Sequence, residues 1–265
     1  MIKLLVTDLD GTILFNDSFP QIVREGIEKL SMYGVKVCIA SGRMLSSIYN
    51  YYRILDLDTP IIAYNGAMIG DKDLNILYHK PIEFSVWFKV FRMLYKKDFQ
   101  INLYFDDKLY IFRKNTFGDR YPLQNKVQAK FVDDPDEIPK LPTTKVLGIG
   151  PPEIVEETQI ELKRIFDSNL YITTSSPTYL EIMNSGVSKG RALMLLSEML
   201  KIPVTDIAGL GDSFNDLELI RDAGIGITFK NSPQELKDVA DYVTESNSPE
   251  GFREVVEFIL WKNRY

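Results

Sequence analysis

The sequence contains very little of two residue types that often build metal sites and nucleophilic dyads: its 265 residues include one cysteine and one histidine. The single cysteine, Cys38, excludes an internal disulfide, which is consistent with a reducing compartment, so we expect a cytoplasmic protein. Cys38 lies in an apolar run, where a small core residue is its simplest interpretation. His79 lies in none of the motifs described below, which argues against serine–histidine and histidine–metal sites, and we interpret it as structural.

Long apolar runs and a basic excess are also missing. No run is long enough to cross a bilayer, and two aspartates within the first 15 residues rule out a signal peptide. The net charge of −6 and the pI of about 5.1 argue against a nucleic-acid-binding surface, which is normally basic. The 45% of hydrophobic and 26% of charged residues are typical of a globular protein. We therefore expect no membrane partner and no nucleic-acid partner.

Both ends of the chain do contain an alternation of short apolar runs with amphipathic stretches of helical period. In the first part, strands are predicted just before Asp8 and over residues 35–40 and 60–63, and helices over 20–33 and 45–55. This alternation is typical of a doubly wound parallel sheet, in which ligands bind beyond the carboxyl ends of the strands. It returns in the last third, with helices predicted over 189–200, 213–222, 232–239 and 251–261 and strands over 206–210, 225–228 and 241–243.

The middle of the chain mixes helices with hairpin signals. Residues 67–80 and 101–112 each contain two short apolar runs separated by a turn-forming segment, as expected for hairpins. Helices are predicted over 84–97 and 153–166, whereas residues 114–142 show no clear pattern. This mixture indicates an α+β unit inserted into an α/β one. We predict a Rossmann-like core made of residues 1–82 and 187–265, and an inserted cap domain of residues 83–186.

The first predicted strand ends in two aspartates one residue apart, Asp8 and Asp10, followed by Gly11. In an extended strand both side chains point to the same side, so their charges repel unless a cation lies between them. A hard cation with oxygen ligands is the natural candidate. An ordinary strand followed by an Asp–Gly turn would explain Asp10, but not Asp8, which follows an apolar strand that we expect to be buried.

Two later segments carry polar residues that match this chemistry. Lys189 is predicted at the start of a helix, where a cation opposes the helix dipole, so it is either a solvated lysine or a functional partner of Asp8. Asp212 and Asp216 lie four residues apart where a predicted strand gives way to a helix, so one helical turn would bring both to one cation. They could instead cap and charge the helix N-terminus, but that interpretation does not explain Asn215 or the flanking glycines.

Together these segments resemble the four motifs of the haloacid dehalogenase (HAD) superfamily. DLDGT at residues 8–12 resembles the first motif and Ser41-Gly42-Arg43 the second, while GVSKG at 186–190 resembles the third. GDSFND at residues 211–216 resembles the fourth motif as found in the Cof-like branch. The resemblance spans nearly the whole chain and implies a cap of the α/β type (C2) between the second and third motifs. One loop, at residues 229–231, reads Phe-Lys-Asn where the branch usually has a Met-Gly-Asn-like sequence.

This resemblance implies a magnesium-dependent phosphatase. Asp8 would attack phosphorus and form an aspartyl-phosphate, and Asp10 would act first as general acid and then as general base. Mg²⁺ would be held by Asp8, Asp212 and the carbonyl of Asp10, with Asp216 orienting these ligands. Lys189 would bind a phosphoryl oxygen and keep Asp8 ionised.

The substrate contacts implied by the resemblance come from both halves of the core. Arg43 and Asn65 would contact the leaving group of the substrate, although Arg43 could also be a surface arginine in a salt bridge. The phosphoryl group would be bound by Ser41, Gly42, Lys189 and Asn215.

Two other functions share parts of this chemistry. A phosphomutase would use the same aspartyl-phosphate but return the phosphoryl group to a sugar. A receiver-type phospho-acceptor module is also doubly wound with acidic strand ends, but it carries its acceptor aspartate mid-chain and needs no inserted domain. We expect a small phosphorylated metabolite, such as a sugar phosphate, as the partner, and a monomer or small homo-oligomer. Release of inorganic phosphate would distinguish a hydrolase from both alternatives.

Overall fold

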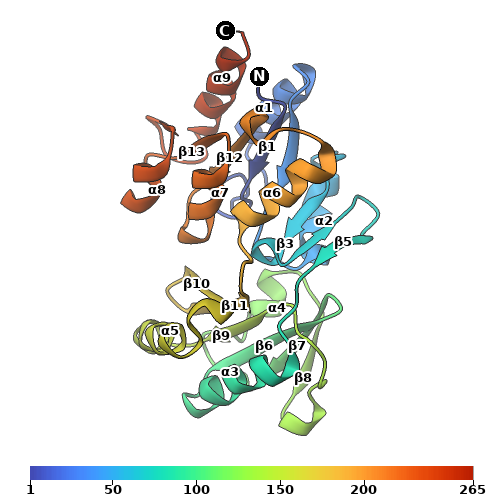
Figure 1. The fold of residues 1–265 in the computed structure, drawn as a ribbon, viewed down its shortest axis with the longest axis vertical. Coiled ribbons are helices and arrows are strands. Elements are labelled where there is room, and N and C mark those ends of the chain that lie inside the picture. Colours follow the sequence, from blue (N-terminus) through green and yellow to red (C-terminus); the bar gives the residue numbers. More distant parts are fainter. Residues whose placement is uncertain (265) are drawn as a thin grey trace.

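The computed structural model describes residues 1–264, which form two lobes connected where the chain passes from one to the other and back (Figure 1). The upper lobe in this view contains both termini and a five-stranded parallel sheet in the order β14-β13-β12-β1-β2. Its strands are β1 (Leu4–Thr7), β2 (Lys36–Ile39), β12 (Ile207–Gly211), β13 (Ile225–Thr228) and β14 (Tyr242–Val243).

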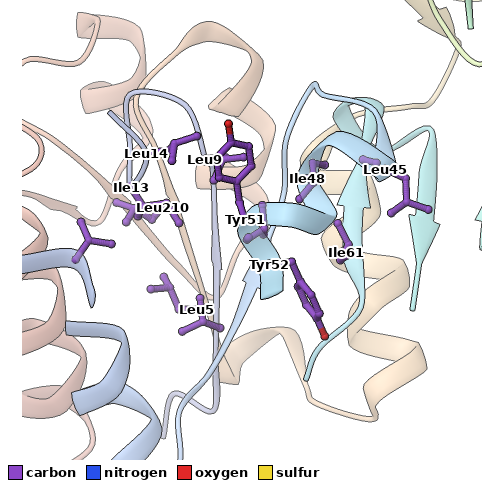
Figure 2. Packing of buried hydrophobic residues seen from close by; sticks show 14 of the residues in the cluster. Leu5, Leu9, Ile13, Leu14, Leu45, Ile48, Tyr51, Tyr52, Ile61 and Leu210 are labelled. Carbon is purple, nitrogen blue, oxygen red and sulfur yellow. The ribbon is translucent and has the colours of Figure 1, made fainter. Parts of the chain in front are cut away.

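The residues of β1 explain why helices cover both faces of this sheet. Leu5 belongs to a hydrophobic cluster with residues of α1, α2 and α9, whereas Leu4 and Val6 belong to another with residues of α6 and α7. Since successive side chains of a strand point to opposite faces, an all-apolar strand requires cover on both. Figure 2 shows Leu5 and Ile48 within the first cluster. The helices are α1 (Gln21–Met32), α2 (Leu45–Ile54), α6 (Lys189–Leu200), α7 (Leu217–Asp222), α8 (Gln234–Val239) and α9 (Phe252–Lys262).

The strand predicted over residues 60–63 does not extend the parallel sheet in full. It forms β3 (Ile61–Ala63), which is joined by an isolated parallel bridge, between Ile62 and Ala40, to the residue that follows β2. Its main partner is the predicted hairpin, so that β3, β4 (Met68–Gly70) and β5 (Ile76–His79) form a small antiparallel sheet. The hairpin prediction is therefore confirmed, and the short β3 serves as the junction between the two sheets.

The lower lobe is a six-stranded sheet with its helices, and we call it the cap. Its strand order is β10-β11-β9-β6-β7-β8, and every pair is antiparallel except β7 with β8. One face packs with α3 and α5 around Trp87, while the other contributes Tyr104 and Leu147 to the cluster that contains α2. The elements are α3 (Phe84–Lys96), β6 (Gln100–Phe105), β7 (Lys108–Phe112), α4 (Tyr121–Gln124), β8 (Ala129–Val132), β9 (Val146–Ile149), α5 (Pro152–Phe166), β10 (Leu170–Ser176) and β11 (Tyr179–Asn184).

The predicted fold class, an α/β core with an inserted α+β cap, is confirmed, and two local predictions need correction. The helix expected over 213–222 begins with a 3₁₀ turn at Phe214–Asp216, and its α-helical part is only α7. Residues 114–142, which showed no pattern, contain α4 and the edge strand β8. The domain boundaries at 82/83 and 186/187 stay a prediction. None of the helices in residues 1–264 combines the length and apolar character needed to span a membrane.

Candidate active site

Three carboxylates meet where two neighbouring strands of the core sheet end. Asp8 follows β1 and Asp212 follows β12, and these strands pair directly. Asp216 comes from the 3₁₀ turn that follows, and one oxygen of each carboxylate lies within 4.8 Å of the other two. The Thr12 hydroxyl donates to Asp212 and lies 3.3 Å from the second oxygen of Asp8. Parallel pairing of β1 with β12 thus brings together residues that are 200 positions apart.

Lys189 supplies the positive charge at this cluster. Its side chain is fully buried at the first position of α6, and Nζ donates to Asp8 and, at 2.6 Å, to Asp216. The N-terminus of α6 is capped by Ser188, whose hydroxyl accepts from the N–H of Arg191 at 3.1 Å. Burial between two carboxylates excludes the interpretation of Lys189 as a solvated surface lysine.

Asp216 organises the loop that carries Asp212. Its second oxygen accepts hydrogen bonds from the backbone N–H groups of Asp212, at 3.1 Å, and Ser213, at 3.0 Å. A Cβ added to Gly211 would lie 2.3 Å from the Cβ of Asp216, so the loop requires glycine there. Both oxygens of Asp216 are therefore used by donors of this chain, which supports an orienting role.

Negative charge at the cluster exceeds what Lys189 neutralises. Burial raises the pKa of Asp8 to about 7, with repulsion from Asp216 and Asp10 adding to the effect and Lys189 opposing it. Burial, with repulsion from Asp8, raises the pKa of Asp212 to about 6. Burial lowers the pKa of Lys189, but the two carboxylates outweigh it and raise this pKa above its ordinary value. Three carboxylates with one cation form an oxygen-rich site that fits a further hard cation.

Replacing Lys189 by methionine should destabilise the fold, because two buried carboxylates would lose their cation. Breaking a buried ion pair from one side typically costs about 3–5 kcal/mol. We expect the free energy of unfolding, measured by urea denaturation without divalent cations, to fall by this amount. Arg191→Met, on the exposed face of the same helix, is the control and should leave it nearly unchanged. Equal stability of the two variants would contradict the structural role of Lys189.

The carboxylate of Asp10 lies outside the three-carboxylate cluster. It is about half exposed, at 49%, and accepts two hydrogen bonds from Arg43, at 2.7 Å from Nε and 2.6 Å from a terminal nitrogen. Arg43 in turn lies over the ring of Tyr51, 5.3 Å from its centroid. Arg43 is thus in a salt bridge, as the alternative interpretation expected, but only 14% of its side chain is exposed and its partner is the predicted acid–base residue. Its contact with a leaving group stays a prediction. The assignment of the Asp10 carbonyl as a metal ligand stays a prediction.

The second motif and the Tyr64-Asn65-Gly66 turn meet beside this cluster. Asn65 adopts a left-handed conformation (φ 53°), and its side-chain oxygen accepts from Asn215 at 3.0 Å. A Cβ added to Gly42 would lie 3.0 Å from that oxygen, which explains a small residue there. The hydroxyl of Ser41 accepts from the N–H of Arg43 at 3.2 Å. Ser41, Gly42, Arg43, Asn65 and Asn215 are therefore neighbours, although they come from three separate segments. Lys189, from a fourth segment, contacts Asp8 and Asp216 beside them.

A cavity of about 270 Å³ opens in front of these residues, and the cap forms its other wall. Two buried cap residues form hydrogen bonds to the core at this cavity: Lys145 Nζ donates to the carbonyl of Gly42 at 2.7 Å, and Glu181 accepts from Asn65 at 2.6 Å. The sequence offered one signal for them, a charge within or directly before an apolar strand. The cap residues that line the cavity are Tyr121, Gln124, Asn125, Lys145, Ser175, Ser176, Tyr179 and Glu181.

Comparison with known proteins agrees with this architecture. Residues 5–256 match the family model described as haloacid dehalogenase-like hydrolase. The chain is 29% identical to a 5-amino-6-(5-phospho-D-ribitylamino)uracil phosphatase of Bacillus subtilis, over 91% of this chain and 89% of that protein. It is 32% identical to TM0651 from Thermotoga maritima, with 97% of each chain covered and a TM-score of 0.80.

A second structure, a haloacid dehalogenase-like hydrolase from Bacteroides thetaiotaomicron, is similar along the full length. The two chains are 25% identical, 98% of this chain and 100% of that one are covered, and the TM-score is 0.85. The family model covers core and cap together, so the match includes both halves of the site. This chain therefore belongs to the haloacid dehalogenase-like hydrolase family, and it is an enzyme.

Proposed function

We propose that this enzyme is a magnesium-dependent phosphatase that hydrolyses phosphomonoesters of small metabolites through an aspartyl-phosphate on Asp8. The observation that carries the proposal is the buried Asp8 carboxylate, which is paired with Lys189 and lines a cavity between the core and the cap. Carboxylates are established nucleophiles toward phosphorus. The phosphatase relatives support the same chemistry.

The two aspartates of the first motif divide the reaction between them. An oxygen of Asp8 attacks phosphorus, the ester P–O bond breaks, and Asp10 gives its proton to the leaving oxygen. Asp10 then takes a proton from water, whose oxygen attacks the phosphoryl group and releases phosphate from Asp8. The half-exposed Asp10 lies at the cavity wall, within reach of a leaving group and of water.

The three-carboxylate cluster fits Mg²⁺ because every donor is an oxygen. Asp8 and Asp212 would hold the ion, with the Asp10 carbonyl, and Asp216 would orient them. When bound, the ion neutralises charge on Asp8 and on the phosphoryl oxygens. Lys189, which is buried beside Asp8, neutralises part of the same negative charge.

We propose that a phosphoryl group attached to Asp8 is bound by Ser41, Gly42, Lys189 and Asn215. All but Lys189 line the same cavity as Asp8, and Lys189 contacts Asp8 directly. Phosphoryl transfer depends mainly on positioning and on stabilising charge at the equatorial oxygens, and hydroxyl, amide and ammonium donors do both. These residues are therefore our proposed phosphate-binding set.

The cavity favours a small polar leaving group such as a sugar. Its volume of about 270 Å³ accommodates a small leaving group more readily than a phosphoprotein loop or a nucleic acid, and hydroxyl and amide side chains of the cap line its outer wall. A panel of phosphorylated metabolites, assayed with Mg²⁺ for released inorganic phosphate, tests the proposal. Transfer of the phosphoryl group to a second sugar without phosphate release would indicate a phosphomutase instead. A stable phosphoenzyme without turnover would indicate a phospho-acceptor module.

Arg43→Ala should impair sugar phosphates more than p-nitrophenyl phosphate. Arg43 holds Asp10 through two hydrogen bonds, and a sugar alkoxide needs protonation by Asp10 far more than a nitrophenolate does. Loss of a charge-assisted hydrogen bond is worth about 1.5–3 kcal/mol, so kcat/KM for the best sugar phosphate should fall roughly 10- to 150-fold. Arg53→Ala, an exposed arginine of α2, is the control. Equal losses on both substrates would place Arg43 at the phosphoryl group instead.

A further inference from the structure

Helix α2 begins without a capping residue of its own. Its first residue is Leu45, and the preceding residue, Met44, offers no side-chain hydrogen bond to the first turn. The first N–H groups of a helix have no partner within the helix and require one elsewhere. The residues just before α2 are those of the second motif, so the position of the first turn of this helix affects the positions of Ser41 and Arg43.

The missing cap is supplied by Asp107, in the turn between β6 and β7 of the cap. Its two carboxylate oxygens accept from the N–H of Leu45, at 3.1 Å, and from the N–H of Ser46, at 2.8 Å. A carboxylate at a helix N-terminus is also favoured by the helix dipole. A residue 62 positions away in the sequence therefore performs the role that a neighbouring Ser, Thr, Asn or Asp normally has.

Asp107 also binds the other segment that forms the site. The hydroxyl of Tyr64 donates to it at 2.7 Å, and the N–H of Tyr64 donates to the carbonyl of Arg43 at 3.0 Å. The next N–H, of Asn65, donates to the carbonyl of Ser41 at 2.9 Å. One carboxylate thus contacts the first turn of α2, which follows Arg43, and Tyr64, whose backbone pairs with Arg43. The phosphate-binding segment is therefore held on two sides by contacts to Asp107.

Two further cap residues hold the same stretch of the core. Lys145 Nζ binds the carbonyl of Gly42, and the hydroxyl of Ser47 donates to the carbonyl of Asn125 at 2.8 Å. Lys145 is buried, with 2% of its side chain exposed, and it lies over the ring of Tyr104. Residues 42–47 are therefore held from the cap at their beginning, middle and end, with Asp107 at the centre.

We propose that Asp107 is a positioning residue of the active site: it supplies the N-cap of α2 from the cap domain of the same chain and thereby fixes the segment that carries Ser41 and Arg43. This inference rests on the proposed function, in which Ser41 binds the phosphoryl group. The cap then does more than exclude water, because without it the phosphate-binding segment lacks three of its hydrogen-bonding partners.

The test compares Asp107→Gly with Asp106→Gly. Both residues lie in the same turn with positive φ, 56° and 49°, so glycine is tolerated equally at either position, and the exposed Asp106 is the matched control. In Asp107→Gly, hydrogen exchange at the amides of Leu45 and Ser46 should be about fivefold faster, the factor typical for loss of an N-cap. Asp107→Asn, which keeps an acceptor oxygen, should restore part of the protection.

The second measurement is the affinity for orthovanadate in the presence of Mg²⁺, determined by calorimetry. Vanadate binding should weaken by up to about fivefold in Asp107→Gly, because the competent arrangement is less populated, and should be unchanged in Asp106→Gly. Unchanged exchange would overturn the capping role, and faster exchange with unchanged vanadate affinity would overturn the positioning role. A wild-type protein that binds vanadate but hydrolyses no ester would contradict the proposed hydrolase and leave this comparison valid.

Discussion

Asp8→Asn is expected to abolish both phosphate release and covalent phosphorylation of the enzyme. An amide oxygen is a poor nucleophile, and the buried Asp8 carboxylate is the group that we propose attacks phosphorus. The readouts are phosphate release with the best substrate of the panel, and the intact mass of the protein after acid quenching during turnover. The fold should survive, because asparagine can still accept a hydrogen bond from Lys189 through its side-chain oxygen.

Asp10→Asn provides the contrast to this result. It leaves the nucleophile intact and removes the acid–base step, which typically contributes about 10²- to 10⁴-fold to the rate. Turnover should therefore fall by that factor. An aspartyl-phosphate should still form with an activated ester such as p-nitrophenyl phosphate, and this intermediate should persist because water is no longer activated. Near-wild-type phosphate release by Asp8→Asn would show that the nucleophile is another group.

The parts of the site that could be predicted from the sequence are those that follow from strand topology. Asp8 and Asp212 each follow an apolar run, and a parallel sheet places the carboxyl ends of its strands at one edge. A cation at a helix start is unfavourable without a partner, but it is the resemblance of GVSKG at residues 186–190 to the third motif that favours a functional Lys189. The structure provides two carboxylates as its partners. For these residues local sequence already indicates both the element and its end.

The parts that could not be predicted depend on how the cap sits on the core, on side-chain contacts between distant segments, or on elements too short to leave a pattern. Asp107 lies in an ordinary Asp-rich turn, and only the docking of that turn on α2 gives its carboxylate a function. The pairing of Arg43 with Asp10 likewise joins two motif residues whose mutual distance no spacing indicates. Residues 114–142 contain Tyr121 and Asn125 of the cavity wall, but α4 spans only one turn and β8 only four residues, so neither leaves a periodic pattern.

Removal of divalent cations is expected to stop catalysis, and added Mg²⁺ to restore it. The chelated protein keeps three carboxylates against one lysine, and burial together with repulsion between neighbouring carboxylates raises the pKa of Asp8 and Asp212. The experiment is a titration of activity with Mg²⁺ after dialysis against chelator. Full activity in excess chelator would exclude the proposed mechanism.

The carboxylate variants separate direct ligands from orienting residues. Asp212→Asn removes a charged oxygen from the cluster and should nearly eliminate activity at any practical Mg²⁺ concentration. Asp216→Asn should instead raise the Mg²⁺ requirement by about 10- to 100-fold, the range for residues that orient ligands, because its oxygens already accept from Lys189 and two backbone N–H groups. Asp73→Asn, an exposed aspartate in the β4–β5 turn, is the control. Calorimetry measures Mg²⁺ binding directly in each variant. If Asp216→Asn lost Mg²⁺ binding as completely as Asp212→Asn, Asp216 would be a direct ligand. Lys189 would then have to give up one of its two carboxylate partners when the ion binds.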